Sequence, residues 1–402
     1  RLRSDDAYTP DQRPGMRPDY PSIVYTKILK ELYPDVPVVL GSIEASLRRL
    51  THYDYWQDKL LPGILASSPA DLLIYGMGEK PIKELVRRLK SGIPFNEIKD
   101  IRQTVYLADK EDAKDDDIVL FSHEECLKDK LKQAKNFRYI EEESNKYNAS
   151  RILQKVGKQV IVVNPPFPPM TEAEIDASYD LPYTRLPHPK YKGKVIPAFE
   201  MIKFSVNIHR GCFGGCAFCT ISAHQGKFIA SRSKESILKE VKAITEMPDF
   251  KGYIHDVGGP TANFRHPSCQ KQLEHGVCKN KQCLFPTACK NLYVDHSDYL
   301  DLLRKLRELP KVKKVFIRSG IRFDYLIYDK DDTFFKEMVK YHVSGQLKVA
   351  PEHVSDAVLE KMGKPENSVY KGFVKRYKKM NERLGMDQYL VPYLMSSHPG
   401  ST

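Results

Sequence analysis

The stretch HRGCFGGCAFCTIS, residues 209–222, places three cysteines within eight residues. Cys212, Cys216 and Cys219 follow the spacing C-x3-C-x2-C, with glycines between them. A tetrahedral zinc site normally takes four protein ligands and a redox disulfide takes two, so three thiols in one loop favour an iron–sulfur cluster with one iron left open. An open iron can bind substrate. A structural zinc site that takes its fourth ligand from elsewhere in the chain remains the alternative.

Strand and helix patterns alternate regularly around this loop. Apolar segments predict five strands, at residues 203–208, 252–257, 314–319, 346–350 and 388–394, and amphipathic patterns predict helices at 233–247, 297–309, 332–342 and 355–384. Repeated βα units with right-handed crossovers form a parallel barrel, open or closed, whose chemistry lies at the C-terminal ends of the strands. The cysteine loop directly follows the first strand, at that end.

The N-terminal half also alternates helix and strand patterns between residues 22 and 89, which predicts part of a parallel α/β sheet. Charge runs at 115–117 and 141–143 then indicate solvent-facing helix and connector. Thr171, followed by Glu174, has the spacing of a capping box at a helix start. We therefore expect an α/β chain divided into an N-terminal domain (1–110), a charged helical connector and lead-in (111–200), and the barrel domain (201–402).

The cysteine loop resembles the C-x3-C-x-Φ-C signature of the radical S-adenosylmethionine (SAM) superfamily, with Phe218 as the aromatic residue. The resemblance implies that Cys212, Cys216 and Cys219 hold a [4Fe–4S] cluster whose fourth iron chelates SAM. It also implies that one electron from the cluster cleaves SAM to a 5′-deoxyadenosyl radical, and that the barrel is a partial parallel (β/α)6-type barrel. Phe218 is expected to pack near the adenine of SAM.

Motifs at the other strand ends extend the resemblance. Gly258 and Gly259 resemble the Gly-Gly-Glu motif that meets the amino group of SAM through backbone atoms, although Pro260 stands in place of the acid. Arg318 and Glu352 are expected to reach the ribose or the substrate, with a structural ion pair as the alternative for each. The segments RSGIRFD (318–324), VAPEHVSDAVLEKMGKP (349–365) and HPGST (398–402) resemble the third, fourth and fifth strand-end motifs of the superfamily branch with an N-terminal cobalamin-type domain.

Segments along the whole chain resemble the YgiQ-type radical SAM proteins, namely RLRSDDAYTP, VVLGSIEASLRRLTHYDYW, LIYGMGEKPI, VVNPPFPPMT and GGPTANF. This resemblance implies a partial Rossmann-like, cobalamin-binding-like α/β domain before the barrel. The loop D-x-H-x-x-G, which supplies the axial histidine in cobalamin-type domains, does not occur in the sequence. We therefore do not expect cobalamin to bind, and interpret the domain as one that packs against the barrel. For the aromatic group His52, Tyr53, Tyr55 and Trp56, we favour core or interface packing over contact with a substrate.

A second group of cysteines lies in a polar insertion, residues 260–296, after the second barrel strand. Cys269, Cys278, Cys283 and Cys289 have the spacing C-x8-C-x4-C-x5-C. Packing does not explain four thiols in so polar a loop, so we predict a second metal site, either an auxiliary iron–sulfur cluster or a zinc ion. Because the insertion leaves the end of the second strand, we expect it beside the SAM site.

Composition indicates an ordinary globular protein, with 41% hydrophobic and 29% charged residues. No run of eighteen apolar residues is present to span a membrane, and the first residues lack the apolar stretch of a signal peptide. Seven of the eight cysteines fall between residues 212 and 289, which is typical of metal binding in a reducing compartment. We therefore expect a cytoplasmic protein. Because Arg1 is not an initiator Met and the sequence stops after the fifth predicted strand, we also expect further residues at both ends.

The net charge of +12 would suit a polyanionic partner such as a nucleic acid, but no nucleic-acid-binding motif accompanies it. We therefore favour solvated helix surfaces as the explanation of the lysines. The leading hypothesis is an enzyme that generates the 5′-deoxyadenosyl radical and abstracts hydrogen from an unknown substrate, with a small flavodoxin- or ferredoxin-like electron donor. A radical methyl- or methylthiotransferase acting on RNA or protein is the near alternative. Methylthiotransferases carry another cysteine triad in their N-terminal domain, and residues 1–125 contain no cysteine. A zinc-organised nucleic-acid-binding protein is the non-enzymatic alternative.

Overall fold

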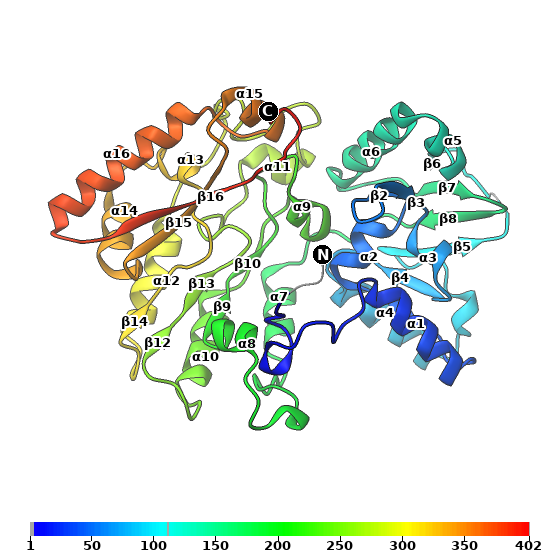
Figure 1. Ribbon diagram of the computed structural model, residues 1–402, viewed down its shortest axis with the longest axis horizontal. Helices are drawn as coiled ribbons and strands as arrows, with labels where there is room; N and C mark the ends of the chain where they lie inside the picture. Colours follow the sequence, from blue (N-terminus) through cyan, green and yellow to red (C-terminus); the bar gives the residue numbers. More distant parts are fainter. Residues whose placement is uncertain (1–3, 111, 402) are drawn as a thin grey trace.

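The computed structural model describes residues 4–110 and 112–401, which form two α/β halves lying side by side (Figure 1). The blue-to-cyan half contains a mixed sheet, and the green-to-red half contains the barrel strands. Within the described ranges, the helices are all too short or too polar to cross a membrane.

The sheet of the N-terminal half has the strand order β1-β4-β5-β8-β7-β6. Its strands are β1 (Val39–Leu40), β4 (Leu72–Ile74), β5 (Thr104–Ala108), β6 (Ile118–Val119), β7 (Ile152–Val156) and β8 (Gln159–Val163). β1 and β4 are parallel, as are β6 and β7, while β5 and β8 pair in antiparallel fashion with their neighbours. The predicted parallel sheet is therefore mixed. One cause is the tight turn between β7 and β8, where Gly157 adopts a φ of 59°.

Segment 111–200 is not the helical connector that we predicted, because β6, β7 and β8 lie within it. The sheet continues to Val163, so the division near residue 110 falls inside the sheet. Ile161 and Val163 on β8 pack with Val105 on β5 in one apolar core. The charge runs that suggested a connector mark loop and helix surfaces between these strands.

Helices and a small hairpin surround the N-terminal sheet. They are η1 (Pro10–Gln12), α1 (Pro21–Leu32), α2 (Ser42–Arg48), the hairpin of β2 (His52–Asp54) and β3 (Lys59–Leu61), α3 (Ile64–Ser67), α4 (Glu79–Lys90), η2 (Phe95–Glu97), α5 (His123–Lys128) and α6 (Lys130–Ser144). The helices predicted from the amphipathic pattern after Ser22 and from the stretch after Gly78 correspond to α1 and α4. Ser122 and Glu125 form a complete capping box at the start of α5.

Parallel strands follow one another around the partial barrel of the C-terminal half. They are β9 (Ser205–Asn207), β12 (Tyr253–Ile254), β13 (Asp256–Gly258), β14 (Lys314–Val315), β15 (Gln346–Glu352) and β16 (Tyr389–Leu394). β13 pairs with β9, β12 with β14, and β15 with β16, all in parallel, and a parallel bridge joins Ile321 to Val349. The predicted strands of the βα units are therefore confirmed, in their expected order.

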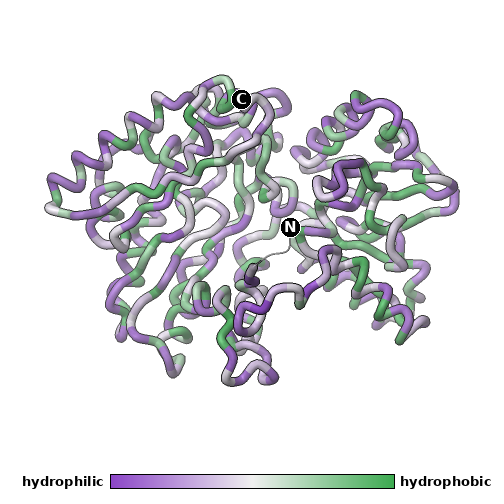
Figure 2. Tube along the Cα trace, viewed as in Figure 1, coloured by the Kyte–Doolittle hydropathy of each residue, from purple (hydrophilic) through white to green (hydrophobic). Residues whose placement is uncertain are grey.

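Helices cover the outside of the barrel strands (Figure 1). The elements are β10 (His209–Arg210), α9 (Thr220–Gln225), β11 (Ala230–Ser231), α10 (Lys234–Thr245), α11 (Gln270–His275), α12 (Ser297–Arg307), α13 (Phe323–Leu326), α14 (Thr333–Glu337), the π-helix η4 (Met338–His342), α15 (Asp356–Met362) and α16 (Asn367–Leu384). Val206, Ile237, Leu303 and Phe373 belong to the core between strands and helices. In Figure 2, hydrophobic stretches follow the strands, while outer helices such as α16 alternate between hydrophobic and hydrophilic residues.

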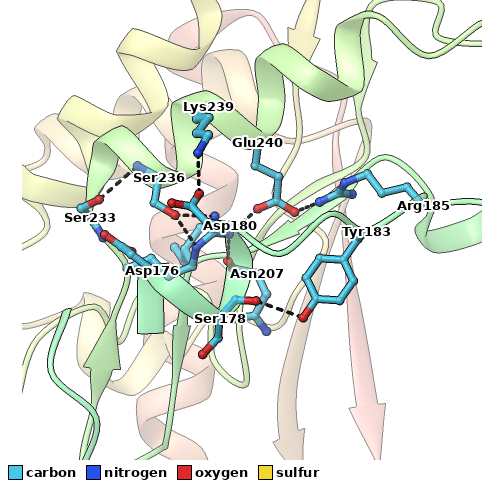
Figure 3. Close-up of polar contacts among 12 residues, drawn as sticks. Asp176, Ser178, Asp180, Tyr183, Arg185, Asn207, Ser233, Ser236, Lys239 and Glu240 are labelled. Atoms are coloured by element: carbon cyan, nitrogen blue, oxygen red, sulfur yellow. Dashed lines mark hydrogen bonds and ion pairs between the residues drawn. The ribbon is translucent and has the colours of Figure 1, made fainter. Parts of the chain in front are cut away.

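The lead-in to the barrel consists of α7 (Glu172–Tyr179), η3 (Pro189–Tyr191) and α8 (Pro197–Ile202). The predicted capping box of Thr171 and Glu174 is confirmed at the start of α7, with both of its hydrogen bonds present. Asp176 accepts a hydrogen bond of 3.0 Å from the backbone N–H of Ser233, where α10 begins. Figure 3 shows how these residues meet between α7 and α10.

A buried arginine fixes the lead-in to the barrel. Arg232 is only 1% exposed, and it forms an ion pair with Glu240. Glu240 also pairs with Arg185 (Figure 3). The Nη1 of Arg232 donates to the carbonyl oxygen of Asn207 at 2.8 Å, and its guanidinium carbon lies 3.9 Å from the centre of the Tyr179 ring. Burial lowers the pKa of Arg232 to about 10. The network ties the segment before the barrel to its first strand.

Candidate functional site

The three-cysteine loop begins at the end of the first barrel strand, where α/β barrels place their chemistry. Gly211 has a φ of 86°, and a Cβ at this position would clash with the backbone of Phe228, so only glycine fits there. The backbone N–H of Ala217 donates to the carbonyl oxygen of Met362 at 2.9 Å, and that of Cys219 donates to Cys216 at 3.1 Å. The loop is thereby held against the fourth βα unit.

The structure brings the three thiols together. Cys212 is buried, while Cys216 and Cys219 are partly exposed. Burial raises the pKa of Cys212 and of Cys219, and the charge of the neighbouring Cys216 raises both further. Thr261 lies beside the sulfur of Cys212, with its Oγ1 at 3.7 Å. The buried thiol of Cys212, with a polar neighbour beside its sulfur, suits a thiolate ligand of an iron–sulfur cluster.

In the part of the chain that the structure describes, no three Cys, His, Asp or Glu side chains converge closely enough to hold a single ion. Thiolates ligate both zinc and iron–sulfur clusters, so the donor set of Cys212, Cys216 and Cys219 fits either kind of centre.

Arg322 lies beside the cysteine loop, and the sequence reasoning missed it. Its Nη1 is 3.6 Å from the sulfur of Cys216, while Nε and Nη2 donate to the two carboxylate oxygens of Asp324 at 2.7 and 2.6 Å. Although burial opposes its charge, the carboxylate of Asp324 and the thiolate of Cys216 together hold the pKa of Arg322 well above its ordinary value. A permanent, buried positive charge therefore faces the cysteine loop.

Glu352 lies at the end of β15, near Arg322, and its contact with the ribose or the substrate stays a prediction. Its side chain is 6% exposed, and Oε2 has no hydrogen-bond partner among the described residues. Its backbone φ of 70° lies in the left-handed region, which costs a non-glycine residue about 1–3 kcal/mol. Burial raises the pKa of Glu352, while Lys364 and Arg322 lower it. A strained, buried carboxyl with a free oxygen is prepared for an external hydrogen-bond donor.

The other residues predicted from motifs occupy different environments. Phe218 packs against α15 in a small apolar cluster, and its ring lies edge-on to His398 at 6.2 Å between ring centres. Arg318 is exposed, and its backbone N–H donates to Asp256 at 2.7 Å, so the structure does not bring its side chain to the cysteine loop. Whether these two residues contact SAM stays a prediction.

The glycine pair at the end of β13 has a packing function. The carbonyl oxygen of Gly258 accepts a hydrogen bond of 2.8 Å from Ile208, inside the barrel. A Cβ on Gly259 would lie 2.6 Å from the ring of His209. His209 is fully buried, and neither of its ring nitrogens has a hydrogen-bond partner among the described residues. Burial lowers the pKa of His209 to about 3, so this imidazole is neutral beside the strand ends.

The cysteine-rich insertion lies next to the three-cysteine loop. The side-chain amide of Gln282 donates to the carbonyl oxygen of Gly215 at 2.9 Å. Cys283 packs against an apolar cluster that includes Cys212, Phe213 and Phe264. The expectation that the insertion lies beside the cysteine loop is therefore confirmed in the structure.

A cavity of about 1180 Å³, including its open mouth, separates the two halves beside α9. Tyr75, Tyr147 and Phe167 contribute aromatic walls, and His224 and Arg49 contribute polar groups. Further contacts cross between the halves near this cavity. Ser46 and His224 lie 2.8 Å apart through Oγ and Nδ1, and Arg210 forms an ion pair of 2.5 Å with Glu79.

Arg49 is a cation without a carboxylate partner among the described residues. Its guanidinium carbon lies 4.9 Å from the centre of the Tyr75 ring, it donates to the carbonyl oxygen of Ser46, and its buried Nε has no partner. Burial lowers the pKa of Arg49. A cation without a carboxylate partner in the wall of a cavity favours a ligand with an anionic group.

The aromatic group on the β2–β3 hairpin does not lie in the core. Tyr53, Tyr55 and Trp56 are each more than half exposed, with the rings of Tyr55 and Trp56 4.9 Å apart. The prediction of core packing was wrong, because a tight two-stranded hairpin holds these rings outward on its tip. Packing at an interface remains a prediction.

Comparison with known proteins agrees with the site. Residues 1–205 match the family "Radical SAM N-terminal", and residues 206–392 match "Radical SAM superfamily". The chain is 62% identical over its whole length to a UPF0313 protein of Porphyromonas gingivalis, 58% to one of Bacteroides thetaiotaomicron and 53% to one of Clostridium botulinum. It spans 65%, 68% and 62% of the lengths of these relatives, about two thirds of each.

Solved structures resemble the chain distantly. The radical SAM methyltransferase TsrM of Kitasatospora setae, with tryptophan and a SAM analogue bound, has a TM-score of 0.48 at 14% identity, covering 100% of this chain and 56% of its own. The cobalamin-dependent radical SAM enzyme OxsB has a TM-score of 0.49 at 12% identity. The match covers 92% of this chain and 39% of the OxsB chain. Nothing about the ligands of this chain follows from so distant a likeness, and the expectation that cobalamin does not bind stays an unsupported prediction.

The family matches and the close relatives confirm the resemblance that the cysteine loop and the strand-end motifs indicated. Membership of the superfamily implies a [4Fe–4S] cluster and SAM, in agreement with the three thiols at the end of the first barrel strand. The chain belongs to the radical SAM superfamily and, within it, to the family of UPF0313 or YgiQ-type proteins.

Proposed function

We propose that this protein is a radical SAM enzyme that abstracts a hydrogen atom from its substrate. The observation that carries the proposal is the triad Cys212, Cys216 and Cys219, gathered at the C-terminal end of the first barrel strand with no fourth protein thiol in its loop. When a [4Fe–4S] cluster and SAM are bound there, one electron cleaves SAM to methionine and a 5′-deoxyadenosyl radical, which takes a hydrogen atom from the substrate and becomes 5′-deoxyadenosine.

The residues around the triad have separate tasks in this proposal. The three cysteines hold the cluster and leave one position for SAM. The cation of Arg322 stabilises negative charge on the thiolate of Cys216 and on the cluster that this thiolate would hold. Glu352 offers its unpartnered oxygen to a hydroxyl or amino group of SAM or of the substrate. Phe218 packs beside the adenine.

We infer that the substrate binds in the cavity between the two halves. The cavity borders α9, which begins directly after Cys219. Its aromatic walls and the cation of Arg49 favour a substrate with an apolar body and an anionic group. A flavodoxin- or ferredoxin-like protein is the proposed electron donor, and the net charge of +12 favours an acidic one.

Anaerobic reconstitution followed by dithionite and SAM tests the reaction. We expect wild-type protein to release 5′-deoxyadenosine, and Cys216→Ala to lose this release. Cys126→Ala is the matched control, because Cys126 lies in the other half and belongs to neither cysteine group. Release that persists in Cys216→Ala contradicts the proposed role of the triad. Formation of S-adenosylhomocysteine in place of 5′-deoxyadenosine contradicts hydrogen abstraction.

The substrate cavity is tested with Ala223→Trp, which places a large ring in the cavity from an exposed position on α9. We expect this variant to retain its iron and its substrate-free cleavage of SAM. Small molecules extracted from cells are expected to stimulate wild-type cleavage but not that of Ala223→Trp. Ala113→Trp, at an exposed site in the N-terminal half, is the control. Equal stimulation of both tryptophan variants contradicts the assignment of the cavity.

A further inference from the structure

A buried asparagine from the insertion holds the backbone of Arg322. Asn263 lies in the segment GGPTANF, after β13, and is 2% exposed. Its Oδ1 accepts a hydrogen bond of 2.9 Å from the backbone N–H of Arg322, and its Nδ2 donates to the carbonyl oxygen of Arg322 at 3.3 Å. An amide that satisfies both backbone groups of one residue fixes the point from which the side chain of that residue extends.

A buried histidine and an aspartate orient the asparagine in turn. The Nε2 of His296 lies 3.1 Å from the Nδ2 of Asn263, and the Nδ1 of His296 lies 2.7 Å from the carboxylate of Asp329. Because Oδ1 of Asn263 already accepts, Nδ2 is the donor, so Nε2 of His296 accepts and Nδ1 carries the proton that it donates to Asp329. The imidazole is 2% exposed and stacks on Phe334, with ring centres 4.6 Å apart. The ring is therefore fixed in one tautomer and one orientation.

The guanidinium of Arg322 fits closely against the three-cysteine loop. Its Nη1 lies 3.6 Å from the sulfur of Cys216, and a Cβ on Gly214 would clash with the same nitrogen. Its guanidinium carbon lies 5.7 Å from the ring centre of Phe264, which stacks on Phe213 of the loop at 3.8 Å. A fit this close depends on the position of the Arg322 backbone.

We propose that this chain of hydrogen bonds positions the guanidinium of Arg322 beside Cys216 and thereby tunes the reduction potential of the cluster. Its members are Asn263, His296 and Asp329. The proposal rests on the proposed function, because it requires a cluster on the three cysteines. The three members are positioning residues, and their effect on the cluster is expected to pass through Arg322.

The variant Asn263→Ala removes both bonds to the backbone of Arg322. After anaerobic reconstitution it is expected to hold as much iron as wild type, with a more negative reduction potential. The shift should be smaller than that of Arg322→Met, because Asp324 still binds the guanidinium. Asn291→Ala, at an exposed position of the same insertion, is the control and should keep the wild-type potential. A wild-type potential in iron-loaded Asn263→Ala overturns the proposal.

A double variant distinguishes positioning from a general effect on structure. If Asn263 acts through Arg322, adding Asn263→Ala to Arg322→Met is expected to cause no further shift in the potential. A further shift as large as that of Asn263→Ala alone overturns the proposal, because the asparagine would then act on the cluster by another route.

A substitution of His296 provides a second test that leaves both bonds between Asn263 and Arg322 in place. His296→Leu removes the acceptor for Nδ2 of Asn263, and the potential is expected to become more negative. The amide of His296→Gln offers both an acceptor and a donor, so this variant should shift the potential less. Equal shifts in the two variants, or no shift in His296→Leu, overturn the role of the histidine hydrogen bonds.

Hydrogen exchange separates this proposal from the proposed function, because it needs no cluster. The backbone N–H of Arg322 is expected to exchange faster in Asn263→Ala than in wild type or Asn291→Ala, as measured by mass spectrometry on the peptide that contains it. Unchanged exchange refutes the anchoring of Arg322 and leaves the proposed function standing. A wild type that takes up no iron and cleaves no SAM refutes the proposed function, and faster exchange in Asn263→Ala then still supports the anchoring of Arg322.

Discussion

The guanidinium of Arg322 lies 3.6 Å from the sulfur of Cys216 and is held there by two hydrogen bonds to Asp324. The charge is buried, so water screens it little. A positive charge beside a cluster ligand stabilises the reduced, more negative cluster relative to the oxidised one. Arg322 is therefore expected to set how easily the cluster proposed at Cys212, Cys216 and Cys219 accepts an electron.

Replacement of Arg322 by methionine is expected to move the reduction potential of that cluster to more negative values. Loss of about 1 kcal/mol of charge stabilisation corresponds to roughly 50 mV for one electron. A redox titration followed by electron paramagnetic resonance measures the shift, and Arg322→Lys, which keeps the charge, is expected to shift less. An unchanged potential in Arg322→Met with intact iron content means that the guanidinium does not act on the cluster.

Glu352 combines a left-handed backbone with a buried oxygen that finds no hydrogen-bond partner within residues 4–110 and 112–401. We expect Glu352→Ala to keep its iron and to bind SAM at least about tenfold more weakly, a loss of about 1.4 kcal/mol, because a hydrogen-bond acceptor is removed. Equilibrium dialysis with labelled SAM measures the affinity. Glu360→Ala, at an exposed position on α15, is the control. Wild-type affinity in Glu352→Ala rules out a role for this carboxyl in SAM binding.

The ion pair of Arg232 and Glu240 is expected to dominate the stability of the junction between lead-in and barrel. Glu240→Ala leaves the buried guanidinium of Arg232 without this partner, so unfolding by denaturant should become easier by about 3–5 kcal/mol. Lys239→Ala removes an exposed pair with Asp180 one residue away and should cost less than about 1 kcal/mol. If the free energy of unfolding falls by a similar amount in Glu240→Ala and Lys239→Ala, the buried pair of Arg232 and Glu240 stabilises the protein no more than an exposed ion pair does.

Stability is expected to fall in mild acid because of buried neutral histidines. Burial lowers the pKa of His342 to about 4, below its ordinary value of 6.5. The unfolded chain therefore binds a proton between these values while the folded chain does not, and the free energy of unfolding falls by about 1.4 kcal/mol for each pH unit below 6.5. His342→Gln should remove this dependence, so the free energy of unfolding should fall by about 1.4 kcal/mol less per pH unit between about pH 6 and pH 5. Denaturant unfolding at several pH values measures the difference. An identical slope in variant and wild type contradicts a neutral His342.

Much of the barrel was predictable because its signals are local. The strands around Val206, Val257 and Val349 are short apolar runs after helix patterns, and the cysteine loop directly follows the first of them. The mixed N-terminal sheet was not predictable in the same way. Strands β5 and β8 pair in antiparallel fashion across 50 residues that include charged helices, and no local pattern specifies that pairing.

The site itself was predicted in part. The thiols of both groups and Glu352 were identified from motifs, whereas Arg318 was chosen where the structure places Arg322. Both arginines lie in the segment RSGIRFD, and only the turn between them decides which one faces Cys216. The left-handed backbone of Glu352 and the contact of Gln282 with Gly215 depend on tertiary packing, which leaves no trace in spacing or residue type.

The most direct test of the central claim is the electron paramagnetic resonance spectrum of the reconstituted and reduced protein, recorded with and without SAM. We expect the spectrum to change on addition of SAM, because Cys212, Cys216 and Cys219 would leave one iron open to ligation by SAM. An identical spectrum with and without SAM would contradict the account, because it would mean that the triad holds a cluster that SAM does not reach.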